Sequence, residues 1–186
     1  MSVKNGESGE AISDAELVRR GREGDESALS GLVDRHHTMA FRVALSLVGD
    51  TDLAQDVVQD AFLKAFRALG GFRGDSAFRT WLLTITANAA RGALRKRGRR
   101  RESDIETAGP LPSKGPDPEE AAEVSEAAGR ARAMLEKLPE KQRLAVQLRI
   151  DEGLSFREIG EIIGSSEGAA RVNYFHGIRR LREWME

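Results

Sequence analysis

Residues 52–69, DLAQDVVQDAFLKAFRAL, decide the fold class of this chain. Apolar residues recur in this stretch at steps of three and four, which is the spacing of one face of an α-helix. They are Leu53, Val57, Val58, Ala61, Phe62, Ala65, Phe66 and Leu69. Gly70 and Gly71 follow at once and end the periodic run. The stretch therefore predicts a long amphipathic helix.

The flanking segments carry the start and stop signals of further helices. Ser13-Asp-Ala-Glu16 has the capping-box pattern that opens a helix, and Gly24-Asp25 separates that helix from a second one. Gly49-Asp50-Thr51 breaks the chain again before residues 52–69. After the FRGDSAF loop at 72–78, a fourth helix is predicted by the apolar residues Trp81, Leu82, Ile85 and Ala89.

Shorter helices are predicted in the C-terminal part of the chain. Leu138-Pro139 starts one, with Pro139 expected at the first helical position, where its missing N–H does no harm. Ser155-Phe-Arg-Glu158 is a second capping box, Gly164-Ser165 is a turn, and Ser166 is a candidate N-cap for the last helix. Their apolar positions are Ile159, Ile162, Ile163, Ala170, Tyr174, Ile178 and Leu181.

A proline-rich segment separates these two helical regions. It contains Pro110, Pro112, Pro116 and Pro118, and this density of proline opposes both helix and strand. No alternating strand pattern occurs in the sequence, so we expect an all-α fold of two small helical domains on a flexible linker. The expected boundaries are a flexible N-terminus at 1–12, a first domain at 13–101, a linker at 102–124 and a second domain at 125–186.

Composition narrows the class of protein. The 186 residues are 40% hydrophobic and 32% charged, which is typical of a soluble globular protein. No apolar run approaches the ~20 residues of a membrane span, and the N-terminus lacks the apolar core of a signal peptide. The absence of cysteine excludes disulfides and thiolate metal sites. Together these features predict a cytoplasmic protein without membrane insertion.

Positive charge is concentrated in one part of a nearly neutral chain. The formal net charge is -1, yet residues 61–101 hold 11 Lys and Arg and a single acidic residue, Asp75. Such a patch attracts polyanions, although a charge run can also be a solvated helix face. Enzyme classes find no support, because the sequence has no phosphate-binding loop, no cysteine nucleophile and no clustered metal ligands. We therefore expect no cofactor and no metal site.

The last two helices have the arrangement of a helix-turn-helix, in which the second helix lies in the major groove of DNA. Arg can pair with guanine, Asn can pair with adenine, and Phe can contact a thymine methyl group. An ordinary helical hairpin with a charged surface, and local packing of Phe175 and His176, are the alternatives. The residues expected to face DNA are Ser166, Glu167, Arg171, Asn173, Phe175, His176, Arg179 and Arg180.

These motifs resemble those of the extracytoplasmic-function (ECF) sigma factors of bacterial RNA polymerase, and within them the sigma-E-like group. The resemblance covers about 13–101 as the sigma2 domain and 125–183 as the sigma4 domain. It rests on residues 52–69, on FRGDSAFRTWL at 72–82 and on LPEKQRLAVQLRIDEGLSFREIGEIIGSSEGAARVNYFHGIRRLRE at 138–183. It implies a subunit that binds core polymerase and directs transcription initiation from chosen promoters.

The resemblance implies DNA contacts in the sigma2 domain. The FRGDSAF loop would capture an unpaired base of the promoter -10 element, with aromatic rings forming a pocket and polar groups reading the base edge. Phe78 and Trp81 could instead belong to the core. The residues implied are Phe72, Arg73, Asp75, Ser76 and Ala77 in the loop, Asn88 in the following helix, and Arg91, Arg95 and Lys96 as phosphate ligands.

The resemblance also implies protein partners. Asp56, Gln59, Asp60 and Leu63 share one side of the 52–69 helix and would bind the β′ subunit of the polymerase, which joins the β subunit among the expected partners. Without the resemblance, this side would be a solvated acidic face. An anti-sigma factor that covers both domains is implied as well.

The sequence departs from the family in its recognition helix. The usual Thr-Val-Lys-Ser-Arg run is replaced by Ala-Ala-Arg-Val-Asn at 169–173, which predicts an altered preference for the -35 element. Two other functions compete with a sigma factor. One is a DNA-binding regulator that does not join polymerase, and the other is a helical partner-binding protein whose basic stretch is merely solvated.

Overall fold

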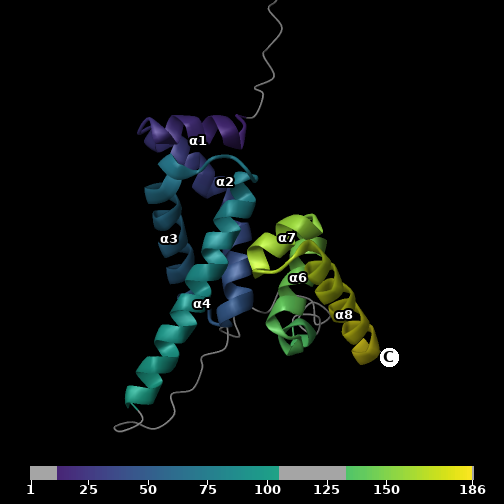
Figure 1. Cartoon of the computed structure of the whole chain (residues 1–186). Coiled ribbons are helices and arrows are strands. Elements are labelled where there is room, and N and C mark those ends of the chain that lie inside the picture. Colours follow the sequence, from purple (N-terminus) through teal and green to yellow (C-terminus); the bar gives the residue numbers. More distant parts are fainter. Residues whose placement is uncertain (1–11, 105–132, 186) are drawn as a thin grey trace, which may run out of the picture.

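Four helices of the N-terminal domain surround one apolar centre in the computed structural model, which describes residues 12–104 and 133–185 (Figure 1). Helices α2, α3 and α4 pack against one another, and α1 lies across one end of them. Leu32, Val58 and Leu82 are among the side chains buried between them. The helices are α1 (Asp14–Arg22), α2 (Glu26–Val48), α3 (Thr51–Ala68) and α4 (Phe78–Asp104), with a 3-10 turn η1 (Leu69–Gly71) after α3.

The ends of these helices are set by local capping, which confirms the predicted breaks. The side chain of Ser13 accepts a hydrogen bond from the Glu16 N–H at 3.3 Å. Asp25 caps α2 through the N–H groups of Ser27 and Ala28, and Asp50 caps α3 in the same way. The Glu16 carboxylate does not complete a capping box in return, because both of its oxygens accept hydrogen bonds from Arg19. Helix α4 continues to Asp104, three residues beyond the predicted end of the first domain.

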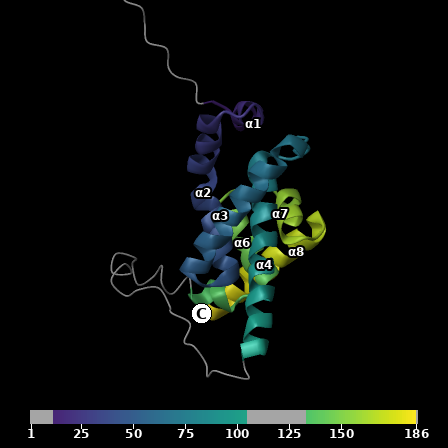
Figure 2. The same ribbon diagram turned by 90° about the vertical axis from the view of Figure 1, so that its left-hand side faces the viewer.

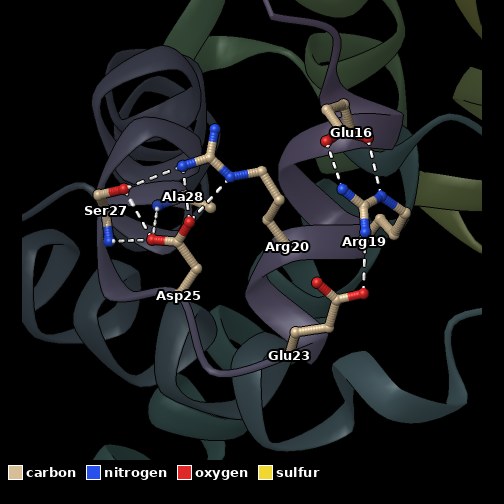
Figure 3. A network of polar contacts seen from close by, with 7 residues as sticks. All are labelled: Glu16, Arg19, Arg20, Glu23, Asp25, Ser27 and Ala28. Carbon is tan, nitrogen blue, oxygen red and sulfur yellow. Dashed lines mark hydrogen bonds and ion pairs between the residues drawn. The ribbon is translucent and has the colours of Figure 1, made fainter.

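A polar network fixes the corner between α1 and α2 (Figure 3). Arg20 Nε donates to Asp25 Oδ2 at 2.8 Å, and the same carboxylate accepts from the Ser27 hydroxyl at 2.7 Å. Hydrogen bonds from Ser27, from Arg20 and from the Ala28 N–H lower the pKa of Asp25 to about 2. The carboxylate is therefore ionised at neutral pH and joins the last turn of α1 to the first turn of α2.

The C-terminal domain consists, within its described part, of a helical turn at 133–137 followed by α6 (Glu140–Ile150), α7 (Phe156–Ile163) and α8 (Glu167–Met185). The capping box of Ser155 and Glu158 is complete, and Ser166 accepts a hydrogen bond from the Ala169 N–H at 3.2 Å. The prediction for Pro139 was wrong by one position. Pro139 is the N-cap of α6, because its ψ of 142° is extended, and its carbonyl accepts from Gln142 and Arg143.

A glycine allows α8 to approach α6 closely. A Cβ atom at Gly177 would lie 2.7 Å from Val146 Cγ2 and 3.3 Å from the Gln142 carbonyl oxygen. Neither distance leaves room for a side chain, so only glycine fits at this crossing. The predicted inward face of α8 is confirmed by the burial of Ala170 and Gly177 and the partial burial of Tyr174 and Leu181. Together α7 and α8 form the predicted helix-turn-helix.

The two domains pack against each other. Helix α7 contacts α4, α6 contacts α2, and a single apolar cluster includes buried residues of both domains (Figures 1 and 2). Polar pairs surround this contact. They join Thr80 to Glu158 at 3.0 Å, Arg79 to Glu158 at 3.3 Å, Arg91 to Glu140 at 2.9 Å, Ser46 to Gln147 at 2.5 Å and Arg42 to Glu152 at 3.1 Å.

Some sequence predictions fall outside the described residues. These are the flexible N-terminus, all but the first few residues of the expected linker, and the start of the second domain near 125.

Glu158 takes part in two of the polar contacts between the domains, one with Thr80 and one with Arg79. Burial raises the pKa of its carboxyl, but hydrogen bonds from the Ser155 N–H and hydroxyl, from Thr80 and from Arg79 outweigh burial and hold the pKa at about 2. Thr80 is itself fully buried, so its hydroxyl depends on this carboxylate. The ionised carboxylate therefore caps α7 and ties it to α4 at the same time.

We predict that Glu158→Gln lowers the free energy of unfolding at pH 7 by about 1.5–3 kcal/mol, the usual range for hydrogen bonds to a charged group. A carboxylate with a depressed pKa stabilises the fold above its ordinary pKa of 4.5, and this contribution is lost as the pH falls towards about 2. The difference between wild type and variant should therefore shrink below pH 4.5 in chemical denaturation experiments. Glu161→Gln, an exposed change on the same helix, is the control. Equal stability of the two variants would contradict the prediction.

Candidate nucleic-acid and polymerase interfaces

The loop between η1 and α4 begins on an aromatic cluster. The ring of Phe72 lies 4.8 Å from that of Trp81 and 6.0 Å from that of Phe78, measured between centroids. Phe78 is only 3% exposed and belongs to the core, whereas Phe72 and Trp81 are partly exposed. Phe72 and Trp81 can therefore offer aromatic surface to a base, and Phe78 can only support them.

The tip of the loop presents polar groups to solvent. Arg73, Asp75 and Ala77 are exposed, and Ser76 is partly exposed. Arg73 forms an ion pair with Asp75 at 3.1 Å, in which both side chains are largely in water. Gly74 between them has a φ of +79°, a left-handed conformation that side chains disfavour. The predicted loop residues are therefore gathered beside the aromatic cluster, in a turn that depends on Gly74.

Helix α4 carries a basic surface beyond the loop. Asn88, Arg95 and Lys96 are exposed, as their predicted contacts with DNA require. Arg91 is placed differently, because its Nε donates to Glu140 of the second domain at 2.9 Å. Its Nη2 is buried and has no hydrogen-bond partner among the described residues, an arrangement that costs free energy. All four residues lie on α4, where three of them are exposed and Arg91 is engaged in the contact between the domains.

The exposed side of α8 combines charged and apolar side chains. Glu167, Arg171, Phe175, His176, Arg179 and Arg180 are exposed as predicted, and Ser166 is exposed at the N-cap. Phe156 of α7 lies beneath this surface, with the guanidinium carbons of Arg149 and Arg171 5.0 and 5.3 Å from its ring centroid. These cation–π contacts orient Arg171 on the outer face of the helix-turn-helix.

Asn173 is placed differently from the other residues predicted to face DNA. Its side chain is partly buried, and its Nδ2 donates to the Ala169 carbonyl at 2.8 Å, so the amide is engaged with the helix's own backbone. Sequence reasoning instead missed Val172, whose side chain is 54% exposed and lies three residues before the equally prominent Phe175. Helical spacing could have found this pair, since positions three apart share a face.

Helix α3 presents the predicted acidic side to solvent. Asp56, Gln59, Asp60 and Leu63 are all exposed, and Leu63 is the large apolar residue among them at 54% exposure. Asp60 forms an ion pair with Lys64 at 2.6 Å within the helix. The opposite side of α3 is buried, so these four side chains are free of any role in the core and form an accessible strip.

Comparisons with known proteins agree with this geometry. The model of Sigma-70 region 2 matches residues 32–100, and the model of Sigma-70 region 4 matches residues 128–181. The RNA polymerase sigma-H factor of Pseudomonas aeruginosa is 38% identical over 174 residues, which are 87% of this chain and 88% of that protein. The chain belongs to the sigma-70 family. Its function is that of an alternative sigma factor of RNA polymerase.

Further relatives place it in the ECF group. The ECF RNA polymerase sigma-E factor of Escherichia coli K12 is 37% identical over 176 residues, 89% of this chain and 91% of that protein. The solved structure of CnrH in complex with the cytosolic domain of CnrY matches with a TM-score of 0.68 and 26% identity, over 92% of this chain and 96% of the other. The sigma factor RpoE bound to the anti-sigma factor NepR from Bartonella quintana has the same fold, with a TM-score of 0.67, 24% identity and coverage of 84% and 95%.

The described part of the chain contains neither a candidate membrane span nor a candidate metal site. No helix at 12–104 or 133–185 is long and apolar enough to cross a membrane. The same residues contain no group of three or more His, Asp or Glu side chains that could hold a metal ion.

The exposed end of α4 allows a test of its role. We predict that Lys96→Ala flattens the salt dependence of DNA binding, because each lost phosphate contact reduces the slope of log K against log salt by about 0.7–0.9. Preference among -10 sequences should change little, since phosphate contacts carry no base information. Lys64→Ala on α3 serves as the control, and binding would be titrated over a series of salt concentrations. An unchanged slope for Lys96→Ala would remove this residue from the DNA interface.

Proposed function

We propose that this sigma factor divides its task among the three exposed surfaces described above. The acidic strip of α3 binds the β′ subunit of core polymerase, the loop at 72–78 with α4 takes the -10 element, and α8 reads the -35 element. The observation that carries this proposal is the exposed strip on α3. A DNA-binding regulator that works alone needs no such surface beside its two basic ones.

The strip has the chemistry of a protein interface. Hydrogen-bond acceptors are supplied by Asp56, Gln59 and Asp60, and the amide of Gln59 also supplies a donor. Leu63 adds an apolar contact of the kind found at the centre of protein interfaces. Because the core of α3 is formed by the opposite side of the helix, a partner can bind the strip without disturbing the fold. The complementary partner is a basic, partly apolar helix, and the β′ subunit is its proposed source.

The -10 element is opened and held in two steps. An unpaired base stacks against Phe72 and Trp81, while Arg73, Asp75, Ser76 and the backbone of Ala77 read its edge. Asn88, Arg95 and Lys96 then hold the strand along the exposed side of α4. Arg91 joins them only after Glu140 releases it.

The -35 element is read in the major groove by α8. Arg171 pairs with a guanine, and the apolar pair Val172 and Phe175 contacts thymine methyl groups. Ser166, Glu167, His176 and Arg179 contact the backbone and base edges around them. Asn173 supports the helix and does not take part in reading.

The relatives of this chain also support a proposal for how the protein is regulated and where in the cell it works. Solved relatives are bound to the cytosolic domain of CnrY and to the anti-sigma factor NepR, and we propose an anti-sigma partner for this chain as well. The protein works in the cytoplasm, with core polymerase supplying all the catalytic chemistry, so the chain itself is no enzyme and needs no cofactor. Co-purification with core RNA polymerase tests the proposal, and failure to bind would favour an independent DNA-binding regulator.

We predict that Asp56→Arg weakens binding to core polymerase by reversing a charge in the strip. The melting temperature and helical content should remain nearly unchanged, because surface substitutions usually alter stability by less than about 0.5 kcal/mol. Asp34→Arg on α2 makes the same charge change at another exposed carboxylate and should bind core normally. Loss of the fold together with binding would show that Asp56 has a structural role.

A second prediction concerns base reading by α8. Arg171→Ala should cost roughly 1–3 kcal/mol on the cognate -35 element and relax preference at one base pair. Arg182→Ala, a change at an exposed arginine nearer the end of the same helix, should weaken binding evenly or not at all. Binding to a set of -35 variants would be compared, and uniform weakening by Arg171→Ala would reassign this residue to phosphate contact.

A further inference from the structure

Arg22 joins two distant parts of the sigma2 domain. It is the last residue of α1, and its side chain reaches the turn η1 nearly fifty residues later in the sequence. Its Nε donates a hydrogen bond to the Leu69 carbonyl at 3.0 Å, and its Nη2 donates to the Phe72 carbonyl. One guanidinium therefore binds the carbonyl oxygens at both ends of η1.

The chemistry of arginine suits this position. The Leu69 carbonyl already accepts the Phe72 N–H at 3.2 Å and has a second lone pair for Arg22, whereas the Phe72 carbonyl lies beyond the helical turn; both are at a helix C-terminus, which carries a partial negative charge. A planar guanidinium supplies a rigid set of donors and a fixed positive charge, so it can satisfy two carbonyls at once. Gly21 sits at a close approach of α1 to its neighbours, because a Cβ atom there would lie 2.6 Å from Leu29 Cδ2 of α2 and 3.2 Å from Leu69 Cδ2.

The same contacts fix the start of the loop that takes the -10 base. Phe72 is held on its backbone by Arg22 and on its ring by Trp81, at 4.8 Å between centroids. The exposed loop residues begin with Arg73, directly after this doubly held position. The direction in which the loop leaves the bundle is therefore set by Arg22 together with the aromatic cluster.

We infer that Arg22 is a positioning residue for base capture, acting through the Phe72 carbonyl. This inference rests on the proposed function of the loop at 72–78. Arg22 does not touch DNA in this role. It holds the backbone of Phe72 so that the ring and the following polar groups face the extruded base together. The specificity of the -10 contact thus depends on α1, a helix that lies outside the loop and outside α4.

The test uses the full chain assembled with core RNA polymerase. Single-stranded -10 oligonucleotides that carry each of the four bases at each position would report the discrimination between preferred and other bases. Arg22→Gln should lower this discrimination about tenfold, the scale of a lost hydrogen bond from a charged donor. Arg22→Lys should restore part of it, because an ammonium keeps the charge but cannot bind both carbonyls in the same geometry. The salt slope and the affinity for core polymerase should not change.

Arg19→Gln is the matched control. Arg19 lies on the same helix, and its guanidinium binds Glu16 and Glu23 within α1, away from the loop (Figure 3). This variant should discriminate like the wild type. The inference is overturned if Arg22→Gln keeps its discrimination or loses no more than Arg19→Gln. It is also overturned if Arg22→Gln weakens binding to all oligonucleotides equally and in step with a lower melting temperature, since Arg22 would then be only a structural brace. A wild-type protein that binds core but shows no base discrimination would instead overturn the proposed role of the loop.

Discussion

Helix α4 is buried on several sides along its first half, and the rest of the structure depends on this constraint. Phe78, Leu82 and Leu83 have almost no exposed surface, and the same holds for the polar Thr80 and Thr86. A helix buried in this way needs neighbours on more than one face, and it finds them in α2 and α3 on one side and α7 on another. Thr86 satisfies its hydroxyl on the Leu82 carbonyl, whereas Thr80 uses Glu158 of the other domain. The buried half of α4 thus contacts both domains, and its second half carries the exposed Arg95 and Lys96 that are proposed to bind DNA.

Two of the three proposed surfaces exist because the core uses only one side of the helix that carries them. Helices α3 and α8 bury one side and expose the other, which leaves the strip proposed for polymerase on α3 and the face proposed to read DNA on α8. The loop at 72–78 is different, since its aromatic start is part of the packing. The helices around the loop therefore fix its position, and at its exposed tip the backbone constrains only Gly74, which leaves the neighbouring side chains free to differ. This separation allows specificity to change without loss of the fold.

Helix ends were predictable because their signals are local. Ser13, Asp25 and Ser155 cap helices through N–H groups two or three residues away, so the sequence alone reveals them. The hydrogen bond of Asn173 to the backbone carbonyl four residues earlier was not predictable, because the amide can bind either solvent or that carbonyl and the sequence does not show which. The contact of Thr80 with Glu158 joins residues 78 positions apart, and the sequence around either residue gives no indication of it. The family resemblance named residues that the structure largely exposes, but it gave no indication of the packing between the domains.

If Arg91 binds the -10 strand as proposed, its ion pair with Glu140 links the arrangement of the domains to the binding of nucleic acid. A phosphate that takes Arg91 has to replace Glu140, so strand binding and this domain contact compete for one guanidinium. Coupling between two ligands is reciprocal. A ligand that favours the packed domains therefore lowers the affinity for the DNA strand, and the strand lowers the affinity for that ligand by the same factor. Control of promoter opening can therefore be exerted from a surface that DNA never touches.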